Sequence, residues 1–103
     1  GAGYIATELA GVLNGLGSKV TMLLRKFHLL RTFDECLVEG VMRVMTDAGV
    51  DIQTCIQLSG LHRCEDGSIA AMQSDGTHVG HYDAVVWAIG RLPSAASLGL
   101  DHV

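Results

Sequence analysis

The hydrophobic positions divide the first part of the chain into a helix signal followed by a strand signal. Between residues 4 and about 16, apolar residues including Ile5, Leu9 and Val12 recur at helical spacing and predict an amphipathic helix. The next run, Lys19–Leu24, is short and apolar, which predicts a buried strand. A glycine-punctuated turn stands immediately before the helix.

The same order of helix and strand repeats after a polar, basic loop. Asp34 is suited to cap a second helix, in which Val41 and Met45 continue the apolar period until Gly49 closes it. Residues Val50–Thr54 then predict another strand. Alternation of helices and strands is typical of a parallel sheet.

Turn signals dominate the sequence beyond Gln57. The segments Glu65-Asp66-Gly67-Ser68 and Asp75-Gly76 separate three short runs with Ile, Val and Thr, which predicts a three-stranded antiparallel meander. Ala84–Trp87 is continuously apolar and predicts a strand buried on both faces of the parallel sheet, ended by Gly90-Arg91-Leu92-Pro93.

Together these elements predict an α/β fold, a Rossmann-like nucleotide-binding domain with a parallel sheet, flanking helices and an antiparallel meander. We expect one partial domain over residues 1–103, with a βαβ-type half at 1–54, the meander at 55–82, and the last parallel strand with its exit loop at 83–103. Such a glycine turn is fed by a buried strand. We therefore expect the first strand to be missing and the chain to be a segment of something longer.

The composition restricts the partners of the chain. An apolar fraction of 49% and a mean hydropathy of +0.33 supply enough material for a core. The net charge of -4, without a basic stripe, makes nucleic acid an unsuitable partner. The longest apolar runs are too short to cross a bilayer of about 30 Å, so no membrane partner is predicted either.

The cysteines and histidines indicate neither a disulfide framework nor a metal site. Cys36, Cys55 and Cys64 are odd in number and form no C-x-x-C pair, which favours a reducing, cytoplasmic compartment. We expect the three thiols to be small buried hydrophobic residues. The five histidines are too sparse for a structural zinc site, so no metal is predicted.

The opening turn is the leading candidate for a phosphate-binding site. Gly1 allows a tight bend, Gly3 allows the backbone to approach a pyrophosphate, and Ala6 allows the helix to pack closely on a strand. The same pattern also suits a plain tight turn before a well-packed helix. The helix and strand that follow favour the cofactor interpretation.

The residues after the second expected strand indicate which dinucleotide is bound. NAD-binding units place an acid there for the ribose 2′-hydroxyl, whereas this chain has Leu24 and then Arg25. Arg25, helped by Arg31 and by Lys26 as an accessory, can donate charge-assisted hydrogen bonds to a 2′-phosphate. The sequence therefore predicts NADP(H). For Lys26 alone, ordinary solvated surface is the simpler interpretation.

Tyr4 and Glu8 lie one helical turn apart and are candidates for the nicotinamide end of the cleft. A glutamate on an early helical turn is also a common dipole-stabilising surface residue, and an early tyrosine is a common packing residue. From the residues alone, both interpretations stay open.

Several stretches, taken together, resemble the NADPH-binding domain of glutathione reductases, within the pyridine nucleotide-disulfide oxidoreductase family. The resemblance covers essentially the whole chain. The stretches that carry it are Gly1-Ala2-Gly3-Tyr4-Ile5-Ala6 with Glu8-Leu9-Ala10-Gly11, Leu24-Arg25-Lys26 through Leu30-Arg31-Thr32-Phe33-Asp34, and Trp87-Ala88-Ile89-Gly90-Arg91.

The resemblance implies a fuller chemistry for a longer protein. In that family a hydride passes from NADPH to FAD, a reduced cysteine pair attacks glutathione disulfide, and a histidine of the partner subunit of a homodimer handles protons. The flavin-binding half, the Cys-x-x-x-x-Cys pair and the dimerisation domain are absent from this sequence. We therefore expect the segment to bind NADP(H), to bind no FAD alone, and not to turn over.

The resemblance also implies a role for each cofactor-binding position. By this similarity, Arg25 and Arg31 would bind the 2′-phosphate, and the stretch from Gly3 to Ile5 would bind the pyrophosphate. Tyr4 would gate the nicotinamide pocket. Glu8 would orient the nicotinamide amide, near a lysine that this chain lacks. Gly90 and Arg91 would line the cleft where the domain returns to the flavin domain.

Other functions remain open at this level. A reductase of the same superfamily acting on trypanothione, lipoamide or mercuric ion would share the domain. A non-catalytic nucleotide-binding or interaction module could use the same turn. A flavin-binding Rossmann unit is a further alternative, although such turns usually lead to an acid where Leu24 stands.

Overall fold

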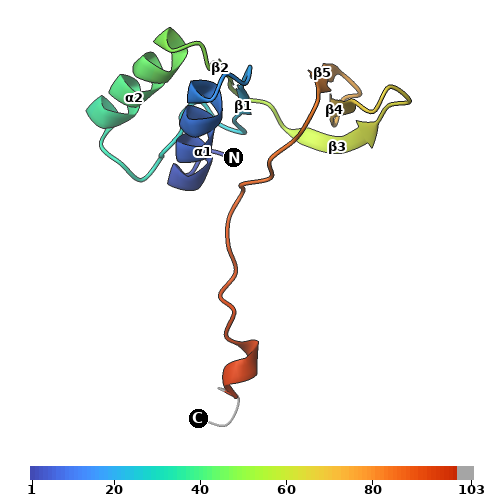
Figure 1. The fold of residues 1–103 in the computed structure, drawn as a ribbon. Coiled ribbons are helices and arrows are strands. Elements are labelled where there is room, and N and C mark those ends of the chain that lie inside the picture. Colours follow the sequence, from blue (N-terminus) through green and yellow to red (C-terminus); the bar gives the residue numbers. More distant parts are fainter. Residues whose placement is uncertain (100–103) are drawn as a thin grey trace.

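The computed structural model of the chain describes residues 1–99 (Figure 1). The elements, in chain order, are α1 (Tyr4–Gly15), β1 (Thr21–Leu23), α2 (Glu35–Asp47), β2 (Asp51–Gln53), β3 (Leu58–Arg63), β4 (Ile69–Gln73), β5 (His78–Tyr82) and the 3-10 helix η1 (Ala96–Leu98). This order confirms the predicted α/β fold with a parallel pair and an antiparallel meander.

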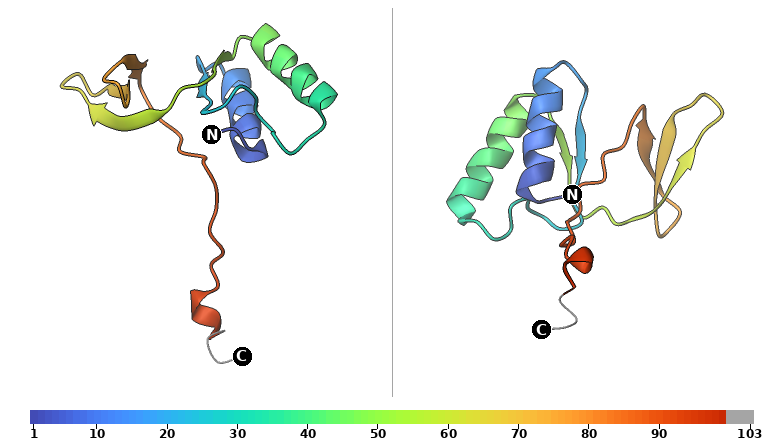
Figure 2. Two further views of the ribbon diagram at one scale, coloured as in Figure 1. Left: turned by 180° about the vertical axis from the view of Figure 1, so that it is seen from behind. Right: turned by 60° about the horizontal axis from the view of Figure 1, so that its bottom comes forward.

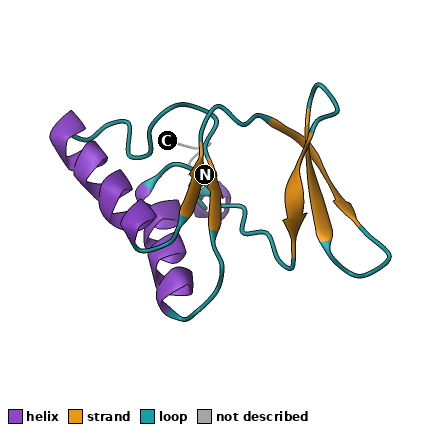
Figure 3. Ribbon diagram, turned by 90° about the horizontal axis from the view of Figure 1, so that it is seen from above, coloured by secondary structure: helices purple, strands orange, loops and turns teal. Residues whose placement is uncertain are grey.

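The elements form three layers when the molecule is viewed from above (Figure 3). Helices α1 and α2 lie together on one side of the β1–β2 pair, and the β3–β5 meander lies on the other side. The chain after β5 leaves the layers and runs away from them toward η1 (Figure 1). The parallel pair thus lies between the two helices and the meander.

Strands β1 and β2 pair in parallel, with Thr21 opposite Asp51 and Leu23 opposite Gln53. The ladder continues past β1, because the Leu24 N–H donates to the Gln53 carbonyl at 2.8 Å. The observed strand is shorter than the predicted Lys19–Leu24 but lies within it. The connection through α2 is the crossover that a parallel pair requires.

Local signals set the ends of both helices. The Asp34 carboxylate accepts a hydrogen bond from the Cys36 N–H at 3.0 Å, so the predicted cap of α2 is confirmed. After the helices, Gly17 and Gly49 adopt φ of 94° and 99°, the left-handed conformation that glycine tolerates best.

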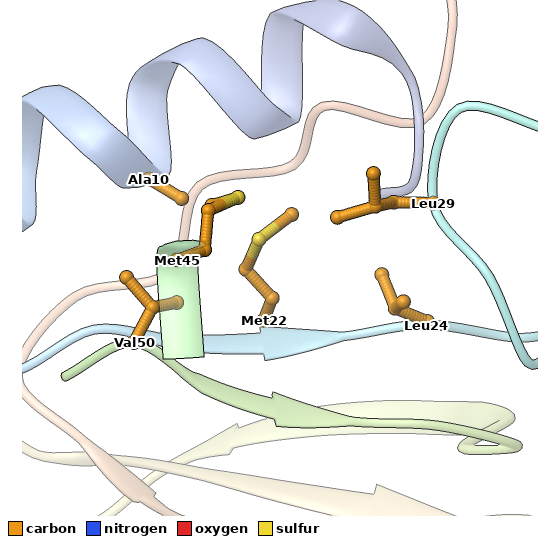
Figure 4. Packing of buried hydrophobic residues seen from close by; sticks show 6 residues of the cluster. All are labelled: Ala10, Met22, Leu24, Leu29, Met45 and Val50. Atoms are coloured by element: carbon orange, nitrogen blue, oxygen red, sulfur yellow. The ribbon is translucent and has the colours of Figure 1, made fainter. Parts of the chain in front are cut away.

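The core lies between the helices and β1 (Figure 4). Ala10 of α1 and Met45 of α2 pack against Met22 of β1. Leu24 and Leu29 are 0% exposed and extend this cluster to the first half of the loop that follows β1. Burying a leucine side chain contributes about 1.5–3 kcal/mol, so these two residues hold that half of the loop against the core.

The meander forms as expected, with β4 in the centre. It pairs antiparallel with β3 and with β5, and a register irregularity interrupts each ladder. Ala70 and Ala71 are both buried, which shows that each face of β4 is covered. The predicted turn Glu65–Ser68 closes the first hairpin.

The predicted strand Ala84–Trp87 is not formed. Residues 84–88 have no strand assignment, and Val86 and Trp87 are each 57% exposed rather than buried. Sequence periodicity identifies a segment that could enter a sheet, but a ladder also needs a neighbouring strand. Within residues 1–99, no strand pairs with this segment.

The cysteines differ from the expected buried residues. Cys36 and Cys55 are exposed, and Cys64 is partly buried. Cys36 lies at the solvated start of α2, and Cys55 lies in the loop after β2 with φ of 58°. No helix within residues 1–99 is long and apolar enough to cross a membrane.

Tyr82 of β5 lies beside Thr21 of β1 and near Asp51 of β2, so it joins the meander to the parallel pair. Its ring also lies over Gly80, where an added Cβ would come 2.8 Å from the phenol oxygen. Burial, with a contribution from Asp51, raises the pKa of the Tyr82 phenol.

A folded-state pKa above the unfolded value means that the folded protein holds the phenol proton more tightly. This contribution to stability is complete below pH of about 10 and is lost as pH rises through the raised pKa. We expect the free energy of unfolding to fall more steeply at alkaline pH in the parent chain than in Tyr82→Phe. Denaturant titrations across that range measure this, and identical slopes would contradict it.

Candidate functional site

A cleft of about 750 Å³ opens where the glycine turn, the loop after β1 and the outgoing segment meet. This volume is within the range of about 300–1,000 Å³ that ligand pockets occupy. The residues that line the cleft are Ala2, Gly3, Tyr4, Ile5, Leu30, Arg31, Thr32, Phe33, Ala88, Ile89, Gly90 and Arg91. Six of the predicted cofactor-binding residues, Gly3, Tyr4, Ile5, Arg31, Gly90 and Arg91, are therefore brought together.

The amino end of α1 forms one wall of the cleft. Gly3 occupies the N-cap position with φ of -84° and ψ of 175°, no side chain caps the helix, and its first turn holds no acid. The first bond of the helix runs from the Thr7 N–H to the Gly3 carbonyl at 3.1 Å, so the amides of Tyr4, Ile5 and Ala6 precede the helical ladder. These groups and the helix dipole favour an anion.

Gly3 leaves this helix end open to a ligand. A Cβ built on Gly3 meets nothing within 4 Å, so the position borders open space rather than packed protein. Any side chain at Gly3 would therefore extend beside the first-turn amides.

The loop after β1 forms the opposite wall and is tied to the glycine turn. The Leu30 N–H donates to the Ala2 carbonyl at 2.7 Å, and the Phe33 N–H donates to the Leu30 carbonyl at 2.8 Å. Leu30 has φ of 48°, which is uncommon for a branched residue. These bonds place Arg31 in the same cleft as Gly3.

Arg25 and Arg31 are not equally placed. Both side chains are exposed, but only Arg31 lines the cleft. Arg25 lies just beyond the carboxyl end of β1, and the backbone on its amino side is fixed because the Leu24 carbonyl accepts a bond from the Ile56 N–H at 2.9 Å. Ligands of α/β sheets bind at the carboxyl ends of the strands, which is where Arg25 lies.

Gly1 brings three parts of the chain together behind the cleft. Its nitrogen lies 3.4 Å from the Leu23 carbonyl oxygen at the end of β1. Figure 2 shows the N-terminus beside this end of the strand. A Cβ on Gly1 would overlap the Ala88 carbonyl oxygen, a clash with backbone that no side-chain movement relieves. The absence of a side chain at Gly1 therefore lets residue 88 pass close to the turn.

Tyr4 and Arg91 close one side of the cleft together. The Arg91 guanidinium donates to the Tyr4 phenol oxygen at 2.8 Å, and its central carbon lies 5.5 Å from the centre of the Tyr4 ring. This combines a hydrogen bond with a cation–π contact. The pair spans the start of α1 and the outgoing segment.

Four predicted residues do not line the cleft: Gly1, Ala6, Glu8 and Arg25. Ala6 instead packs against the core, and Glu8 is exposed one turn further along α1. Sequence reasoning missed six lining residues, Ala2, Leu30, Thr32, Phe33, Ala88 and Ile89. Ala2 and Leu30 are brought to the cleft by the hydrogen bond between their backbones. The types of their side chains therefore gave no signal in the sequence.

The family profile described as "Pyridine nucleotide-disulphide oxidoreductase" matches residues 1–102. The chain belongs to the pyridine nucleotide-disulphide oxidoreductase family. This family membership implies flavin and nicotinamide cofactors for the class of protein.

Two curated relatives of this chain are glutathione reductases. That of Schizosaccharomyces pombe is 35% identical over 98% of the chain, and that of Burkholderia cepacia is 37% identical over 100% of it. The chain spans 22% of the length of each relative. A solved structure, the Cu(II) complex of the HOCl-induced flavoprotein disulfide reductase RclA from Escherichia coli, is 30% identical with a TM-score of 0.84, covering 98% of this chain and 22% of that one.

Within the described part of the chain, no group of three or more His, Cys, Asp or Glu side chains is arranged to hold a metal ion. The cleft itself contains neither histidine nor cysteine among its lining residues.

Proposed function

We propose that this chain binds NADPH in the cleft between the glycine turn, the loop after β1 and the outgoing segment. The observation that carries the proposal is the uncapped amino end of α1 beside Arg31, with the two walls joined by the bond from Leu30 to Ala2. Free amides of a helix end suit a pyrophosphate, and guanidinium groups suit the additional 2′-phosphate.

In this proposal the two walls of the cleft bind different phosphate groups of NADPH. The amides of Tyr4, Ile5 and Ala6 would hold the pyrophosphate, and Gly3 would let it approach. Arg25 and Arg31 would hold the 2′-phosphate. NADPH, when bound, supplies a hydride.

The remaining site residues would act at the nicotinamide end. Tyr4, held by Arg91 across the cleft, would cover the nicotinamide pocket. Gly90 would leave room beside it. Glu8 lies a turn further along α1 and would orient the amide.

We further propose that the protein containing this chain is an FAD-dependent reductase of glutathione disulfide, acting as a homodimer in the cytoplasm. The two glutathione reductases at 35% and 37% identity support this substrate class. In this proposal residues 1–54 form the nucleotide half, the meander at 55–82 supports it, and the flavin and a redox cysteine pair lie outside this chain.

Reduction of a different disulfide is the second candidate. It is favoured by the 30% identity to a flavoprotein disulfide reductase of Escherichia coli, which approaches that of the glutathione reductases. The nucleotide site proposed for this chain would be the same in both cases.

The proposal is tested by titrating the intact protein with NADPH and with NADH. We expect NADPH to bind at least about tenfold more tightly, since one charge-assisted contact contributes about 1.5–3 kcal/mol. Equal affinities would reject the nucleotide assignment. NADPH oxidation on addition of glutathione disulfide tests the substrate separately, because failure there with an intact NADPH preference would reject only the substrate.

A further inference from the structure

One face of the meander gathers a thiol and several imidazoles away from the cleft. The register places His62 of β3, Ala70 of β4 and His81 of β5 in one row across the sheet. Directly paired residues of antiparallel strands share a face. Cys64 directly follows β3, and its side chain contacts His81 of this row.

Cys64 and His81 are in hydrogen-bonding contact. The Cys64 Sγ lies 3.8 Å from the His81 Nδ1. When the proton of the neutral imidazole is on Nε2, Nδ1 is free to accept the thiol proton. The contact thus places a base beside a nucleophile, the arrangement that activates thiols for attack.

The backbone holds Cys64 in place, and a second imidazole lies beside His81 without contacting the thiol. Cys64 is fixed by its backbone, because its N–H donates to the Ser68 carbonyl at 2.8 Å and its carbonyl accepts from the Gly67 N–H at 3.0 Å. The His78 ring lies nearly parallel to the His81 ring, at an interplanar angle of 5° and a centroid separation of 6.0 Å.

A carboxylate completes the group. Hydrogen bonds from Ser68 hold the pKa of Asp66 below its ordinary value, and the nearby His81 acts in the same direction. Asp66 is therefore an anion close to His81.

The other two thiols lack this arrangement. Cys36 and Cys55 are exposed, whereas Cys64 is only partly so. Among the described residues, Cys64 is the cysteine with a histidine at hydrogen-bonding distance. If exposure alone decides reactivity, Cys36 and Cys55 react faster than Cys64. If a neighbouring base decides it, Cys64 reacts fastest.

We propose that Cys64 is a site of thiol–disulfide exchange with small disulfides, with His81 as its base. His81 Nδ1 accepts the Cys64 proton, and the thiolate attacks one sulfur of the disulfide. The S–S bond of the small disulfide breaks as the mixed disulfide forms, and the departing thiolate takes the proton back from His81. Cys64 is oxidised, and half of the small disulfide is reduced to a thiol. The proposal does not depend on the nucleotide function.

The test uses the intact protein, oxidised glutathione as the probe, and mass spectrometry of the peptides that carry each cysteine. We expect Cys64 to form the mixed disulfide at least tenfold faster than Cys36 and Cys55, although it is less exposed. His81→Gln should slow Cys64 about a hundredfold, the smaller end of what a positioned general base contributes. It should leave the other two thiols unchanged.

His78→Gln is the matched control, because it removes the stacked ring and leaves the Cys64 contact intact. Cys64 should react at the parent rate in this variant. The ranking of the three thiols in the parent protein needs no variant, so it remains a test even if His81→Gln fails to fold. A Cys64 no faster than Cys36 or Cys55, or a rate unaffected by His81→Gln, overturns the proposal.

Discussion

Replacing Gly3 by aspartate is expected to stabilise α1 while abolishing most of the binding of NADPH. Gly3 already has the extended N-cap backbone that aspartate adopts, and a Cβ there meets nothing within 4 Å. The new carboxylate would accept hydrogen bonds from the first-turn amides and complement the helix dipole, adding about 0.5–1 kcal/mol of stability.

The same carboxylate would occupy the proposed pyrophosphate donors and would repel phosphate. Losing one such contact lowers affinity by about tenfold to a hundredfold, and several are lost together. Thermal melts and NADPH titrations on the same preparation measure the two effects. An unchanged affinity would show that the helix end does not bind the nucleotide.

Gly11→Asp is the charge-matched control for this variant. Gly11 lies within α1, a Cβ there also meets nothing within 4 Å, and the residue does not line the cleft. We expect Gly11→Asp to bind NADPH as the parent does. A loss of binding equal to that of Gly3→Asp would indicate a general effect of charge rather than a local one.

Replacing Arg25 by alanine is expected to remove most of the preference for NADPH over NADH. Loss of one charge-assisted contact to the 2′-phosphate costs about 1.5–3 kcal/mol, or tenfold to a hundredfold in affinity for NADPH. NADH has no such phosphate, so its affinity should stay unchanged. The double variant with Arg31→Ala should bind both nucleotides equally, as fluorescence titrations would show.

Arg43→Ala provides the control for charge, because Arg43 is exposed on α2 and does not line the cleft. It should keep the preference for NADPH. If NADH affinity fell as far as NADPH affinity in Arg25→Ala, the residue would be acting through the fold of the loop. The 2′-phosphate assignment to Arg25 would then be wrong.

The elements that the sequence predicted correctly are those whose cause is local. Helical periodicity together with the Asp34 cap located α2, and the turn residues around Asp66 located the first hairpin of the meander. The glycine turn and the start of α1 followed from the same short-range signals. These features depend on residues that are neighbours in the chain.

The features that escaped prediction depend on contacts between distant residues. Residues 84–87 have the composition of a buried strand, but they form no strand. A strand forms only where another strand is available to pair with the segment. Cys55 is exposed because β2 ends at Gln53, which leaves Cys55 in the loop that follows. The inclusion of Phe33 and Ala88 in the cleft follows from the loop and the outgoing segment folding back to the turn.

The left-handed backbone of Leu30 has a consequence for how a ligand meets this protein. Holding a branched residue at φ of 48° costs about 1–3 kcal/mol, which the buried Leu29 and the bond to Ala2 offset when the chain folds. The backbone on the amino side of Arg31 is therefore fixed in the folded chain before any ligand arrives. In the proposed binding of NADPH, this backbone would need no rearrangement, so less conformational entropy would be lost on binding.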